Sequence, residues 1–221
     1  MLSRIVYPVT TSGTYYLAVT TFPDADFSGD GASGGRYVLD LQAISGVLLN
    51  LGDDSSQQLA LGFTFPFNGT SYTSVFVNSN GNLTFGSGDS DFSESVAELL
   101  SDQPRIAPLW DDLSPNNGGL VIADGDASSM TVTFSGVPEF PSAGSNTFSV
   151  TMFPSGNYMV SYGGISAVDG LTGTTQGGGA ANPGPTNLSA AGPFSKSGTT
   201  YELFNAGNPV DLTGKVLVFD Q

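Results

Sequence analysis

The sequence predicts an all-β protein: an antiparallel, jelly-roll-like β-sandwich with one short helix and an added N-terminal β-hairpin. Three observations support this fold class. Short runs of β-branched and aromatic residues recur along the chain, turn signals separate them about every ten residues, and only one segment has helical spacing. With 30 Gly and 13 Pro to form turns, and 11% aromatic residues to fill a core, about eleven to thirteen short strands are expected.

The first predicted element is a hairpin within an N-terminal segment, residues 1–45. Thr14–Phe22 and Tyr37–Gln42 are its strands, joined by an Asp- and Gly-rich loop. An isolated two-stranded hairpin is only marginally stable in water, so its apolar side chains need a cover. Either the hairpin adds to the chain's own sandwich or it pairs with another molecule through Tyr15, Leu17, Val19, Tyr37, Leu39 and Leu41.

The remainder, residues 46–221, is predicted to form one β-sandwich domain. Thr73–Gly86 is its clearest hairpin, because Asn80-Gly81 suits a two-residue type I′ turn. Ser93–Asp102 is the single helical segment, with Ser93 as its expected N-cap. The other expected strands are Leu59–Phe67, Arg105–Leu113, Leu120–Ala123, Met130–Val137, Thr147–Phe153, Tyr158–Ile165, Thr199–Phe204 and Lys215–Asp220, with an irregular loop at Gly170–Gly192.

Alternation along these strands predicts which side chains face the interior. The candidates are Phe63, Phe65, Val75, Val77, Leu83, Phe85, Ile106, Trp110, Val132, Phe134, Phe148, Val150, Met159 and Val216.

Charge and composition exclude several functions. The formal net charge is -15, and five basic residues are too few for nucleic acid or an anionic membrane surface. The chain has no His and no Cys, which excludes Ser–His hydrolysis and argues against zinc catalysis. No apolar run is long enough to insert into a membrane. The acidic balance instead favours divalent cations as partners.

One loop has the beginning of a calcium-binding pattern. Asp24, Asp26, Ser28 and Asp30 alternate around Gly29, as the oxygen ligands of a calcium loop do. The twelfth position is Gly35 rather than the bidentate Glu, so the loop is either a calcium site or a solvated turn.

Weaker acidic patterns occur further along the chain. They are Asp124-Gly-Asp126 and Asp89-Ser-Asp91, whereas Asp53-Asp54 is interpreted as a turn.

A carboxylate pair for glycoside hydrolysis is the remaining catalytic option. Asp111, Asp112 and Glu139 are the candidates, but no spacing selects a pair among them. The simpler interpretation is that Trp110 lies in the core while the two Asp residues turn the backbone at the end of a strand. The sequence therefore predicts a protein that is not an enzyme.

Two motifs carry a resemblance to a known family. LGFTFPFNGTSYTSVFVNSNGNLTFG is followed by PRIAPLWDDLSPNNGG, and from about Leu51 to Gln221 the chain resembles the nidogen-like (NIDO-like) modules of bacterial extracellular proteins. The resemblance implies a β-sandwich with an adhesive or structural role and carries over no catalytic residue.

A shorter resemblance covers the N-terminal segment. SGTYYLAV and RYVLDLQ are similar to the last two strands of the bacterial pre-peptidase C-terminal domain, whose preceding strands are absent.

These observations predict a non-catalytic, secreted or cell-surface structural or adhesive subunit. It is expected to assemble with copies of itself, as an oligomer or an extracellular filament built by strand pairing, or to bind extracellular matrix or surface polymers. Calcium is the cofactor that the Asp24–Asp30 loop would take. The alternative is a carbohydrate- or substrate-binding accessory module of a larger secreted hydrolase. Tyr72, Phe92 and Phe140 are the candidates for stacking on sugars, although the favoured interpretation places them in the core or in a lid.

Overall fold

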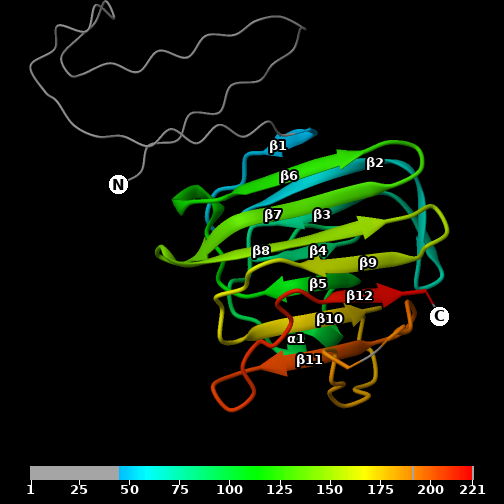
Figure 1. The fold of residues 1–221 in the computed structure, drawn as a ribbon. Coiled ribbons are helices and arrows are strands. Elements are labelled where there is room, and N and C mark those ends of the chain that lie inside the picture. The colour runs from blue at the N-terminus through cyan, green and yellow to red at the C-terminus, as the bar shows by residue number, and fades with distance from the viewer. Residues whose placement is uncertain (1–44, 191, 221) are drawn as a thin grey trace, which may run out of the picture. The chain divides into compact units, whose positions relative to one another are not determined.

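The computed structural model describes residues 45–190 and 192–220. They form two antiparallel sheets of six strands each, packed as two layers, with one short α-helix (Figure 1). The predicted all-β sandwich is therefore confirmed. The predicted N-terminal hairpin, with Asp24, Asp26, Ser28 and Asp30 and with the six strand-pairing residues, lies outside the described residues.

The first sheet has the strand order β1-β6-β7-β8-β9-β12. Its consecutive strands β6 to β9 form a meander, and the short strands β1 and β12 lie at its edges. The strands are β1 (Val47–Leu49), β6 (Leu120–Gly125), β7 (Met130–Glu139), β8 (Ala143–Met152), β9 (Tyr158–Tyr162) and β12 (Val216–Phe219).

The second sheet has the order β11-β10-β5-β4-β3-β2. Here β2 to β5 form the meander, and β2 and β11 are the edges. The strands are β2 (Ser56–Phe67), β3 (Thr70–Asn78), β4 (Asn82–Thr84), β5 (Arg105–Trp110), β10 (Gly170–Thr175) and β11 (Thr200–Phe204). The chain passes between the sheets from β1 to β2 and again from β5 to β6.

Aromatic side chains from both sheets meet in the main core. Phe65 and Phe67 of β2 pack with Phe85, which follows β4, and both contact Tyr158 of the first sheet, whose ring also stacks on Phe219. Such pairs prefer offset or edge-on contacts and stabilise the fold beyond their buried area.

Most of the predicted interior positions are buried, with two corrections. Met159 is only partly buried and Val216 is 56% exposed, because their neighbours Tyr158, Val160, Leu217 and Phe219 occupy the inward positions. In a strand, a shift of one residue moves every side chain to the opposite face. Phe63 is partly buried against the core.

A second, smaller core lies on the other face of the second sheet, beneath α1 (Val96–Ser101). Its members are Leu99, Ala107, Trp110, Leu171 and Tyr201. Trp110 is therefore buried as expected, but on the face opposite Ile106 and Leu109, which belong to the main core.

Three local predictions are wrong. The helix begins after Ser95, not Ser93: the Ser95 side chain accepts a hydrogen bond from the Glu98 N–H. Gly170–Gly192 is not an irregular loop throughout, since it begins with the fully buried strand β10. The loop between β3 and β4 has three residues, with Gly81 but not Asn80 at positive φ, which excludes a type I′ turn.

Candidate functional site: an acidic loop end

Several loops from both sheets meet where β5 ends, and we call this region the acidic end. The β1–β2 loop, the β3–β4 loop, the segment before α1 and the residues after β5 are joined there by hydrogen bonds. The acidic residues of this region are Asp53, Asp54, Asp89, Asp91, Glu94, Asp111, Asp112, Glu139 and Asp169.

The β3–β4 loop is the buried centre of the acidic end. Asn80 is 1% exposed, and its Nδ2 donates to Asp54 Oδ1 at 2.9 Å and to the Asp91 carbonyl at 3.0 Å. Its own carbonyl accepts a hydrogen bond from the Asp111 N–H, at 3.3 Å. The loop therefore connects the segment before β2 with the segment after β5.

Arg105 at the start of β5 is fully buried. Its guanidinium pairs with Asp89, lies 4.0 Å from Asp102, and stacks 3.7 Å from the centre of the Trp110 ring. Burial lowers the pKa of Arg105, and the charge of Asp89 opposes that shift. This ion pair holds the segment before α1 against β5, which is a structural role.

Asp111 is the buried carboxylate of the WDD motif. Its Oδ1 accepts from the Asp112 N–H at 2.8 Å, while its Oδ2 has no partner. Burial and then the charges of Glu139, Glu94 and Asp169 raise the pKa of Asp111 to about 7, against the opposing effect of the Asp112 hydrogen bond. Asp111 thus keeps its proton to a higher pH than an ordinary Asp does.

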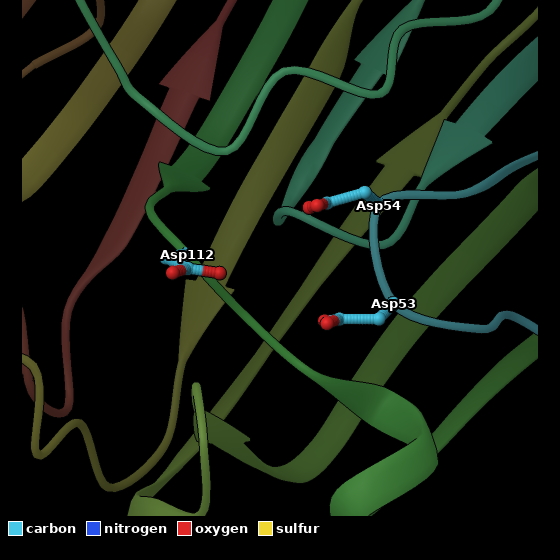
Figure 2. A group of neighbouring side chains, drawn as sticks. All are labelled: Asp53, Asp54 and Asp112. Carbon is cyan, nitrogen blue, oxygen red and sulfur yellow. The ribbon is translucent and has the colours of Figure 1, made fainter.

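Asp112 belongs to a different group of carboxylates. Figure 2 shows Asp53 and Asp54, on one loop, facing Asp112 on the neighbouring segment. One oxygen of each carboxylate lies within 4.8 Å of the others. Burial is the largest cause that raises the pKa of Asp112, and the charges of Asp54 and Asp53 raise it as well.

The three carboxylates considered for catalysis, Asp111, Asp112 and Glu139, therefore belong to two different groups. Asp111 is influenced by Glu139, whereas Asp112 faces Asp53 and Asp54. Asp53 and Asp54 do form the predicted turn, but that interpretation did not anticipate Asp112 beside them. The sequence analysis also did not predict Asn80 and Arg105 as members of the site. Arg105 stands at the start of an otherwise apolar strand, and that position is a sequence signal that could have indicated its role.

The weaker acidic patterns have other contacts. Asp89 pairs with Arg105, and Asp91 accepts hydrogen bonds from the Ser93 N–H and hydroxyl. Asp124 accepts from Ser45, and Asp126 accepts from the backbone and hydroxyl of Ser128, which lowers its pKa. These oxygens stabilise loops by local hydrogen bonds.

Comparison with known proteins identifies the family. A family model described as NIDO related matches residues 32–219. The chain belongs to the NIDO-related family. No curated protein and no solved structure matches the chain.

Membership in the NIDO-related family fits an extracellular structural or adhesive module, and the all-β fold fits a non-enzymatic one. The resemblance seen in the TSVFVNSNGNLTFG and IAPLWDD motifs is thereby confirmed. Among the described residues, no helix is both long and apolar enough to cross a membrane.

Proposed function

We propose that this NIDO-related chain is a secreted or cell-surface subunit that joins to other copies of itself by strand pairing along β2. The observation that carries the proposal is the nature of this edge. β2 has twelve residues, pairs on one side with β3, and contains no charged residue, in a chain whose net charge is -15.

Exposed edge strands are usually protected against association by charges, by proline or by irregularities. β2 has Pro66 near its end and a register shift between Ala60 and Phe65, but its first five residues, Ser56–Ala60, pair regularly with β3. An added strand would gain main-chain hydrogen bonds along this part. The residues that would supply the strand are Tyr15, Leu17, Val19, Tyr37, Leu39 and Leu41 of the predicted hairpin.

The full-length protein tests this proposal by analytical ultracentrifugation over a wide concentration range, followed by electron microscopy. We expect oligomers or filaments. Because Ala60 is exposed on the edge strand, Ala60→Glu places a negative charge between acidic copies and should weaken association about tenfold or more. Ala60→Val keeps the strand apolar and serves as the matched control.

The donor strand is tested with Leu17→Asp and Leu39→Asp in the same assay. Both substitutions should reduce association if the hairpin supplies the strand. A full-length protein that stays monomeric at high concentration would contradict self-assembly, and undiminished association of Ala60→Glu would contradict the β2 edge as the contact.

A second candidate function is favoured by two exposed aromatic residues. Phe92 and Phe140 are 52% and 51% exposed, and the Phe140 N–H donates to the Asp112 carbonyl, which places Phe140 at the acidic end. Tyr72 instead packs on Phe85 in the core. Aromatic faces of this kind stack on sugars, so a glycan array should give hits that Phe92→Ala and Phe140→Ala remove if the chain is a carbohydrate-binding module.

A further inference from the structure

The acidic end contains a group of carboxylates whose charges no ion pair among the described residues neutralises. Asp53, Asp54 and Asp112 each place one oxygen within 4.8 Å of the other two. The three basic residues of the described part, Arg105, Lys196 and Lys215, bond to Asp89, to Asn157 and to the Ser189 carbonyl instead. Three negative charges at this separation repel one another unless a cation lies between them.

A buried oxygen beside the carboxylates is an independent sign of a missing ligand. The Asn80 Nδ2 donates to Asp54 and to the Asp91 carbonyl, and these two acceptors set the orientation of the amide. The amide therefore lies beside Asp54, and its Oδ1 is buried and accepts no hydrogen bond. Burying a polar oxygen without a donor or a cation is costly, so the oxygen requires a partner.

The chemistry of these groups selects the kind of cation. All four side chains offer oxygen, and the chain contains no His and no Cys to provide softer ligands. Calcium accepts six to eight oxygens in flexible geometry, whereas magnesium demands a near-ideal octahedron. Asp53 and Asp54 are exposed, so water can complete the coordination.

We propose that Asp53, Asp54 and Asp112, together with the Asn80 amide oxygen, bind a calcium ion. The ion would join the β1–β2 loop, the β3–β4 loop and the segment after β5. The β1–β2 and β5–β6 connections both pass from one sheet to the other. The ion would therefore link these two connections at one end of the sandwich. This site differs from the Asp24–Asp30 loop, and it is independent of the proposed self-assembly.

The site is tested on the full-length protein after removal of metal with a chelator. Calorimetric titration with calcium chloride should show binding. The melting temperature should rise by about 5–10 °C at a hundredfold excess over Kd, and less with magnesium chloride. Asp112→Asn should reduce calcium affinity at least tenfold, and Asp53→Asn provides a second variant at an exposed position.

Two controls distinguish this site from the remaining carboxylates of the chain. Asp211→Asn removes an exposed carboxylate outside the group and should leave binding unchanged. The triple variant Asp24→Asn, Asp26→Asn, Asp30→Asn removes the carboxylates of the N-terminal loop and should retain the binding event that Asp112→Asn removes.

The calcium-free proteins give a further readout. Asp112→Asn relieves repulsion, so without calcium it should melt at or above the wild-type temperature and no longer respond to calcium. Absence of calcium binding, or binding that only the triple variant removes, would overturn the proposal. A folded Asp112→Asn protein with undiminished affinity would also overturn it.

Discussion

At the scale of single residues, Gly81 shows why the β3–β4 loop can occupy a buried position. Its φ is 73°, in the region that favours glycine, and the Leu109 N–H donates to its carbonyl at 3.3 Å. A Cβ on Gly81 would lie 1.8 Å from the Leu109 carbonyl oxygen, which is backbone and cannot move aside. Only glycine allows the loop to approach β5 so closely.

We therefore expect Gly81→Ala to lower the free energy of unfolding by about 3 kcal/mol or more, from backbone strain and the clash together. Gly86→Ala is the matched control, because Gly86 has a φ of 94° but no atom within 4 Å of an added Cβ. It should cost about 1–2 kcal/mol. Urea denaturation of both variants measures the difference, and equal losses would show that the close approach to Leu109 is unimportant.

At the scale of elements, β5 is buried along its whole length and carries a charge at its first residue. Arg105 is fully buried between Trp110 and Asp89, and its Nε and Nη1 have no hydrogen-bond partner. Burying such a pair has a desolvation cost close to its Coulombic gain, but leaving one charge without its partner is strongly unfavourable.

Asp89→Asn should therefore destabilise the protein by about 3 kcal/mol, because the buried Arg105 keeps its charge and loses its closest counterion. Adding Arg105→Met removes the charge and retains an apolar side chain of similar length, so the double variant should recover most of the loss. Chemical denaturation of the two variants provides the comparison. A double variant as unstable as Asp89→Asn alone would show that the ion pair is not the cause.

At the scale of the whole molecule, the excess of acidic residues makes stability depend on pH. In the folded protein the pKa of Asp111 is about 7 against an ordinary value of 3.8, because of burial and then the charges of Glu139, Glu94 and Asp169. The pKa values of Glu94 and Glu139 are also raised, with burial as the first cause. Carboxyl groups with raised pKa favour the protonated, neutral form in the folded state.

Between about pH 4 and pH 7 the unfolded chain has lost the Asp111 proton while the folded chain retains it. The folded state then binds more protons, so the free energy of unfolding should fall as pH rises through this range. Asp111→Asn keeps an oxygen for the Asp112 N–H and should flatten this decrease, making the variant more stable than wild type at pH 7. Thermal denaturation across this range tests it, and parallel pH profiles for the two proteins would contradict it.

Much of the architecture could be predicted because strand signals are local. The VFV and LTF runs, the alternation in Met130–Val137 and the helical spacing before Asp102 each depend on neighbouring residues alone. The errors have local causes as well. The Asn80-Gly81 dipeptide is compatible with more than one turn, and the faces of Met159 and Val216 depend on a register that alternation does not specify.

By itself, the sequence determined that this chain is an acidic all-β protein without His or Cys, and where most of its strands lie. Only the tertiary structure decided that Asp53 and Asp54 face Asp112, that Asn80 is buried beside them, and that Trp110 belongs to a second core under α1. The physical reason is that strand formation follows the period of the side chains along the chain. Contacts between loops instead depend on the order of strands in each sheet and on where the chain crosses between sheets, which no local pattern encodes.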